Sequence, residues 1–79
     1  MTPEQSRAAR GWLGWSQGDL AERAHVGLST VKDYEAGKRR PIQNNLDAMQ
    51  RAFEDAGLSF VNDASGKPQG IALSGQSPS

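Results

Sequence analysis

The chain has 79 residues, with nine acidic and nine basic side chains, one histidine and no cysteine. A chain of this length forms a single small domain. The lack of cysteine excludes disulfides and thiolate metal sites. Because no apolar run is long enough to span a bilayer and no signal peptide is recognisable, we expect a cytoplasmic protein without a membrane partner.

The sequence also lacks the motifs of catalysis. Its single histidine belongs to no metal-ligand cluster, no glycine-rich phosphate loop follows a strand, and no serine, histidine and aspartate are spaced as a triad. A chain this small leaves little volume for a substrate pocket. We therefore predict that the protein is not an enzyme and uses neither a metal nor a cofactor.

The first residues are typical of a helix start. Thr2 is a good N-cap, Pro3 suits the first helical position, and Gln5 completes a capping box. The helix is predicted to run to about Leu13, with Gly14 as its stop.

Two tryptophans lie near the end of this helix. Trp15 comes after the stop and is expected in the core or partly covered at the surface. Trp12 fits the core and a dimer surface equally well. Since a core of this size is only marginally stable alone, we expect the protein to form a homodimer.

Two short helices joined by a tight turn are predicted between residues 17 and 37. Ser16 is the expected N-cap of the first, supported by Asp19 three residues later. The second is predicted over residues 28–36, with Gly27 as a weaker N-cap and Gly37 as its stop. Apolar residues at helical spacing give each helix a buried face. They are Leu20, Ala21 and Ala24 in the first helix and Leu28, Val31 and Tyr34 in the second.

A fourth helix is predicted over residues 43–56, with Gly57 ending it. Its buried face has helical spacing and consists of Leu46, Met49, Ala52 and Phe53. The pattern then changes to two short strands over residues 58–61 and 70–73, joined by a turn-rich loop.

These elements predict a mainly α fold in three parts. A four-helix domain covers residues 1–57, and a β-hairpin covers residues 58–73. The polar end over residues 74–79 is predicted to be disordered.

An ordered set of residues in the helical part carries a family resemblance. The set consists of Gln17, the pair Leu20-Ala21, Val26, Val31, the pair Tyr34-Glu35 and the run Gly37-Lys38-Arg39-Arg40-Pro41. In this order the residues resemble the helix-turn-helix of the phage-repressor-like (XRE) family of DNA-binding domains, over roughly residues 3–57. His25 departs from the family, which usually has Gly at this turn position, although His tolerates a left-handed backbone better than most residues.

The resemblance implies a repressor-like recognition helix over residues 28–36 that enters the major groove of DNA. The positions that read bases correspond to Leu28, Ser29, Lys32 and Asp33. The positions that bind phosphate correspond to Gln17, Thr30, Lys38, Arg39, Arg40 and Asn44. For Gln17, Asp33 and the basic loop Lys38–Arg40, ordinary solvated side chains are the alternative. The resemblance further implies a structural ion pair between Arg10 of the first helix and Glu35 at the end of the recognition helix.

Charge is distributed unevenly along the chain. Residues 28–45 hold four basic side chains against two acidic ones, and residues 46–63 hold one against four. We predict a sequence-specific, dimeric transcriptional regulator whose partner is double-stranded DNA. The zero net charge, the weak cap at Gly27 and the presence of Leu28 and Asp33 on the reading face favour the alternative, a protein-interaction module such as an antitoxin or an adaptor.

The predicted hairpin needs something to pack against, because an isolated two-stranded hairpin is not stable. We predict that it joins two copies of the chain by edge pairing or by packing on the partner's fourth helix. The alternative is a hairpin folded back on its own helices, with dimerisation elsewhere. The apolar residues assigned to dimerisation are Phe60, Val61, Ile71 and Leu73.

Overall fold

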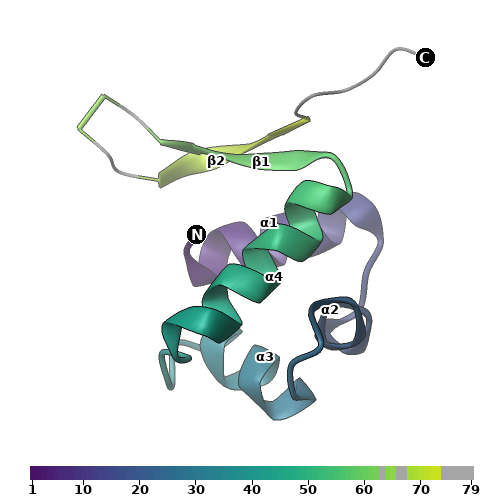
Figure 1. Ribbon diagram of the computed structural model, residues 1–79. Coiled ribbons are helices and arrows are strands. Elements are labelled where there is room, and N and C mark those ends of the chain that lie inside the picture. The colour runs from purple at the N-terminus through teal and green to yellow at the C-terminus, as the bar shows by residue number, and fades with distance from the viewer. Residues whose placement is uncertain (63, 66–67, 74–79) are drawn as a thin grey trace.

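The computed structural model of the chain describes residues 1–62, 64–65 and 68–73. Four helices come first and two strands follow, as predicted (Figure 1). Their bounds are α1 Pro3–Leu13, α2 Gln17–Ala24, α3 Leu28–Glu35, α4 Gln43–Asp55, β1 Leu58–Asn62 and β2 Pro68–Leu73. The mainly α fold with a C-terminal β-hairpin is thus confirmed. The predicted tail over residues 74–79 lies outside the described residues.

The first two helices begin with complete capping boxes. In α1, the Thr2 hydroxyl accepts from the Gln5 backbone N–H, and the Gln5 side chain accepts from the Thr2 backbone N–H. Ser16 and Asp19 form the same reciprocal pair at the start of α2. Because each box satisfies two N–H groups that the helix leaves without partners, both starts are fixed by local sequence.

The ends of α1 and α2 use the left-handed backbone. Gly14 has φ 71°, and His25 has φ 58° and is the non-glycine residue with positive φ among those described. The cap N–H of His25 donates to the carbonyls of Ala21 and Glu22. The chain therefore makes the expected tight turn after α2 with His25 in the place of glycine, at a cost of about 1 kcal/mol.

The starts of α3 and α4 differ from those of α1 and α2. Their N-cap residues, Gly27 and Ile42, make no side-chain capping hydrogen bond.

Helices α3 and α4 end one residue earlier than predicted, because Ala36 and Ala56 are C-caps rather than helical residues. After α4, the N–H groups of Ala56 and Gly57 donate to carbonyls three residues back, which tightens the final turn, whereas after α3 the N–H of Lys38 donates to the Asp33 carbonyl five residues back.

One apolar core lies between the helices and the hairpin. Trp15 is half-buried and stacks on Phe53, with ring centroids 5.6 Å apart, and Phe53 meets Phe60 edge to face at 5.8 Å. Arg23 lies over the Trp15 ring, 4.5 Å from its centroid. The buried members of the core are Ala9, Leu20, Ala21, Ala24, Val31, Tyr34, Leu46, Met49, Ala52, Phe53 and Leu58.

The hairpin packs on its own helices, and its pairing with a second copy of the chain stays a prediction. Strands β1 and β2 are antiparallel, with Phe60 opposite Ile71 and Leu58 opposite Leu73. β1 contacts α4 and β2 contacts α1. Leu58 is 1% exposed, so the core continues across the boundary predicted after residue 57. The hairpin covers the end of the molecule opposite α3 (Figure 1). No helix among the described residues is long and apolar enough to cross a membrane.

Candidate nucleic-acid interface

The geometry of α2 and α3 is fixed by small and branched side chains between them. Leu20, Ala21 and Ala24 of α2 are buried, as is Val31 of α3. Val26 in the turn packs against the core, and its backbone N–H donates to the Ala21 carbonyl at 3.0 Å. Because the alanines are small, the two helices approach closely, and this close packing fixes α3 against α2.

The outward face of α3 holds the four residues predicted to read bases. Ser29 and Lys32 are exposed, Asp33 is half-buried, and Leu28 is 43% exposed. The buried residues of the same helix are Val31, Tyr34 and Glu35. The helix thus presents one face to the core and a polar face to solvent, and Leu28, predicted on the buried face from its spacing, instead lies on the exposed face.

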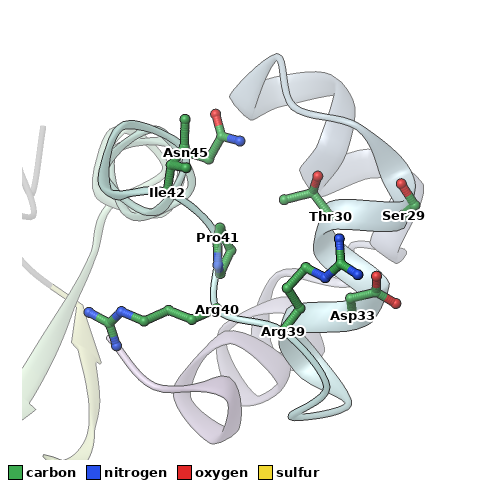
Figure 2. A pocket seen from close by; sticks show the side chains of 8 residues that line it. All are labelled: Ser29, Thr30, Asp33, Arg39, Arg40, Pro41, Ile42 and Asn45. Carbon is green, nitrogen blue, oxygen red and sulfur yellow. The ribbon is translucent and has the colours of Figure 1, made fainter.

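A shallow depression of about 240 Å³ separates α3 from the segment that follows it (Figure 2). Its lining combines hydroxyl, amide, carboxylate and guanidinium groups with two apolar side chains. It consists of Ser29, Thr30, Asp33, Arg39, Arg40, Pro41, Ile42 and Asn45. Figure 2 shows the Arg39 side chain directed toward Thr30 and Asp33, whereas the Arg40 side chain extends away from α3. The two neighbouring arginines therefore point in different directions.

The residues predicted to bind phosphate are exposed with two exceptions. Lys38, Arg39, Arg40 and Asn44 are all exposed, and Thr30 is half-buried on the rim of the depression. Gln17 is half-buried, and its Nε2 donates to Oε1 of Glu35 at 3.1 Å. Gln17 thus holds a structural contact in the free protein, and contact with phosphate would use the second N–H of its Nε2.

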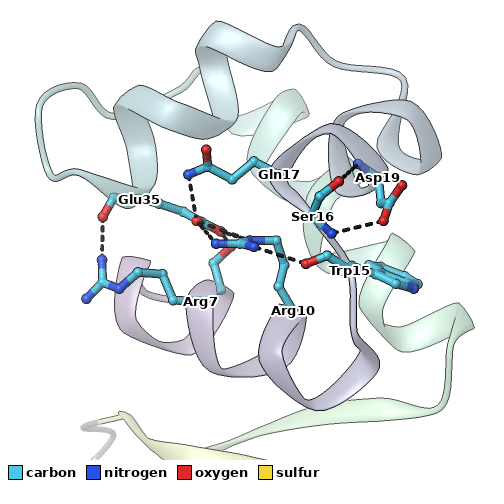
Figure 3. A network of polar contacts seen from close by, with 8 residues as sticks. Arg7, Arg10, Trp15, Ser16, Gln17, Asp19 and Glu35 are labelled. Carbon is cyan, nitrogen blue, oxygen red and sulfur yellow. Dashed lines mark hydrogen bonds and ion pairs between the residues drawn. The ribbon is translucent and has the colours of Figure 1, made fainter.

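Glu35 is the centre of a buried polar network (Figure 3). Its side chain is 2% exposed and forms an ion pair with Arg10, whose Nη2 lies 2.6 Å from Oε1. Arg10 Nε also donates to Oε2 at 2.9 Å, and its Nη1 donates to the Trp15 carbonyl at 3.0 Å. The Ser6 hydroxyl donates to Oε2 at 2.6 Å. The predicted ion pair therefore exists, and it joins α1 to the last residue of α3.

The network shifts the acidity of both charged partners. Burial of the Glu35 carboxyl opposes its ionisation, but hydrogen bonds from Arg10, Ser6 and Gln17 outweigh this effect and hold its pKa below the ordinary value. The hydrogen bond to Glu35 raises the pKa of Arg10. The pair is therefore ionised at neutral pH.

Several contacts around this network were not predicted from the sequence. Ser6 is buried with 0% exposure, and Arg7 Nη1 donates to the backbone carbonyl of Glu35, at the end of α3. The Tyr34 hydroxyl donates to the Met1 carbonyl at 2.9 Å, and burial raises the pKa of Tyr34. In the sequence, the only indication of these contacts is that Ser6 and Arg10 lie four residues apart, on one helical face. Together these contacts hold the C-terminal end of α3 against α1 and the first residue of the chain.

The four residues assigned to dimerisation have different environments. Phe60 and Ile71 are half-buried and pack against the chain's own core. Val61 is 36% exposed on the other face of β1. The backbone of Leu73 pairs with Leu58, while its side chain is outside the described part of the structure.

An apolar surface adjoins the hairpin, on the side formed by α1. Trp12 is 64% exposed, and with Leu58, Ile71 and Ala72 it lines a hollow of about 120 Å³. Exposed tryptophan at an apolar hollow is typical of a protein-interaction surface. Trp12 therefore lies outside the core, and its place on a dimer surface stays a prediction.

Among the residues the structure describes, no group of three or more histidine, cysteine, aspartate or glutamate side chains could hold a metal ion. The polar groups of the exposed α3 face, the depression and the basic loop are instead donors and acceptors of the kinds that DNA-binding proteins use on phosphates and base edges.

Comparisons with known proteins agree with this geometry. A helix-turn-helix family model matches residues 7–54, which include α2, α3 and most of α1 and α4. The multiprotein-bridging factor 1 of Schizosaccharomyces pombe is 37% identical over 57 residues. That match covers 72% of this chain and 36% of the yeast protein, so the chain spans little more than a third of its relative's length. The chain belongs to the XRE, or phage-repressor-like, family of helix-turn-helix domains.

Proposed function

We propose that the protein is a sequence-specific DNA-binding transcriptional regulator that acts as a dimer. The observation that carries the proposal is that three features adjoin one another. The polar face of α3, the depression and the exposed basic loop Lys38–Arg40 are contiguous, and the residues of α3 opposite them are buried. A helix with this exposure can enter a major groove while the loop contacts the adjoining phosphates.

The proposal gives different tasks to the exposed residues. Ser29 and Lys32 read base edges, and Leu28 contacts a thymine methyl group or a sugar. Asp33 accepts a hydrogen bond from a cytosine amino group. Arg39 and the other predicted phosphate contacts supply affinity that depends on salt rather than sequence. This division is compatible with zero net charge, since residues 28–45 hold four basic side chains against two acidic ones.

The dimer would form at the end of the molecule opposite α3. There, two sheet edges are available in the two-stranded hairpin, and Trp12 and Val61 are exposed beside it. Pairing through this end would leave both copies of α3 free to contact DNA, and it would fix their separation. Phe60 and Ile71 would contribute only the parts of their side chains that their own core leaves uncovered.

A second candidate function, a protein-interaction module, is favoured by two observations. The similar yeast protein is named a multiprotein-bridging factor. In addition, the hollow beside Trp12 is an apolar surface on a domain with zero net charge. On this reading, the hollow binds a different protein, and DNA binding is weak or absent.

One experiment separates the two functions. Duplexes bound by the protein are selected from a random pool, and binding to an unselected duplex is measured over a range of salt concentrations. The first function predicts an enriched sequence and an affinity that falls steeply with salt. Absence of binding to any duplex at low salt would contradict it and leave the interaction module as the better proposal.

A further inference from the structure

Ile42 combines two features that are unfavourable for folding. It occupies the N-cap of α4, with φ −61° and ψ 155°, and makes no side-chain capping hydrogen bond. Serine, threonine, aspartate or asparagine would be more stable at an N-cap, as Thr2 and Ser16 demonstrate in α1 and α2. The Ile42 side chain is also 68% exposed, the highest value among the exposed large apolar side chains of the described residues. Neither capping nor core packing therefore accounts for an isoleucine here.

Ile42 lies beside residues of the proposed DNA-binding face. It lines the depression together with Ser29, Thr30 and Asp33 of α3 (Figure 2). Ile42 and Asn45 stand on the α4 side of this depression, and the three α3 residues stand on the other. A nucleic acid that contacts Ser29 and Asp33 would thus cover Ile42 as well.

We propose that Ile42 contacts the C5-methyl group of a thymine, and so adds one base pair of specificity to that read by α3. The proposal rests on the proposed function. An isoleucine side chain offers nothing to a phosphate oxygen, whereas the thymine methyl is the apolar group on the base edges of the major groove. Burying a branched aliphatic side chain against it removes apolar surface from water on both partners. A residue that is unfavourable for folding and has no structural benefit is also expected at a binding site.

The test uses the full chain and a duplex selected from a random pool. Each thymine of the duplex is replaced in turn by uracil, which removes only the methyl group. Wild-type protein should lose about fourfold in affinity at one of these positions, as expected for one buried methyl group. The Ile42→Ser variant should bind the thymine duplex about fourfold more weakly and be insensitive to the same replacement. Ile42→Val, which keeps a branched aliphatic side chain, should retain the sensitivity.

The thermal stability of the variants distinguishes lost contact from lost fold. Ile42→Ser supplies a capping hydroxyl to α4 and should raise the melting temperature by about 4 °C. Weaker binding by a more stable protein cannot arise from unfolding. If Ile42→Ser retains wild-type affinity, or remains as sensitive to uracil as the wild type, the inference is wrong while the proposed function stands. If wild-type protein binds no duplex at all, both fail together.

Discussion

Gln5 Nε2 donates to the backbone carbonyl of Gly70, 2.9 Å away, and this contact joins the first helix to the last strand. The same amide nitrogen lies 3.5 Å from the Val61 carbonyl of β1, and Oε1 accepts from the Thr2 backbone N–H. One buried side chain, 4% exposed, thus completes a helix cap and holds both strands of the hairpin.

Substitution of Gln5 by glutamate separates these two roles. The carboxylate can still accept from Thr2, but it has no N–H for Gly70 and would face two carbonyl oxygens. We expect Gln5→Glu to lower the free energy of unfolding by about 1–3 kcal/mol, because a buried hydrogen bond is lost and an acceptor is left unpaired. Amide exchange should accelerate in β1 and β2 more than in α1. Equal acceleration in all three elements would contradict the assignment.

Removal of the Arg10 side-chain charge should destabilise the protein far more than removal of that of Arg7. Arg10→Met leaves Glu35 buried without its ion-pair partner, and we expect a loss of about 3–5 kcal/mol in unfolding free energy. Arg7→Met is the matched control, since Arg7 is exposed and donates to the backbone carbonyl of Glu35. Its expected cost is about 1 kcal/mol. Denaturant unfolding of both variants measures the difference, and similar midpoints would contradict the prediction.

The contribution of Glu35 to stability should depend on pH. Because the pKa of Glu35 is lower in the folded protein than its ordinary value of 4.5, the folded state favours the ionised form. The contribution is therefore complete above about pH 4.5 and is lost as the pH falls through the folded-state pKa. In Glu35→Gln this loss should be absent. The difference in unfolding free energy between the two proteins should narrow on acidification, and a constant difference would refute the prediction.

The proposed reading and docking residues should fail in different ways. Lys32→Ala should relax preference at one or two base pairs, costing about 1–3 kcal/mol if the lysine contacts guanine. Arg39→Ala should weaken binding to all sequences and reduce the salt slope by about one unit. Arg51→Ala, at an exposed arginine of α4 outside the basic loop, is the control. The assignment is wrong if Lys32→Ala changes only the salt slope while Arg39→Ala changes the base preference.

The proposed dimer is best tested at its exposed residues. Truncation after Gly57 would also remove Leu58 from the core, so monomers could then result from unfolding. Trp12→Lys and Val61→Lys place charges on exposed positions, and each should shift sedimentation from dimer to monomer while the helical circular dichroism signal at low temperature is retained. Ala8→Lys, at another exposed position of α1, is a control for added charge. Dimers in both variants would place the interface elsewhere.

Local signals in the sequence predict most of the helical part. The capping box at Thr2, the N-cap at Ser16 and the stop at Gly14 depend on neighbouring residues only, and the structure has all three. The left-handed turn at His25 was expected from the family resemblance. The core faces of α2 and α4 follow from helical spacing in the same way. The ion pair of Arg10 with Glu35 joins residues distant in sequence, and it was predictable only through the family resemblance.

Contacts between distant segments could not be predicted from local patterns. Nothing near Gln5 indicates that its amide reaches Gly70, and nothing near Ser6 indicates a buried partner in α3. The packing of the hairpin also depends on which surfaces the helices leave uncovered. For that reason the sequence left both pairing modes open, and the strands proved longer than their apolar runs because backbone pairing extends to Asn62 and Pro68.

The two tryptophans lie in different environments, so their fluorescence reports on different parts of the protein. Trp15 stacks on Phe53 beneath the guanidinium of Arg23, so its emission should change when the core unfolds. Trp12 is 64% exposed and should emit at longer wavelength until something covers it. In a Trp15→Phe variant, a blue shift of the remaining emission would report cover over the hairpin end. Such a blue shift on addition of a partner, or the opposite red shift when a dimer dissociates on dilution, could be followed without any attached dye.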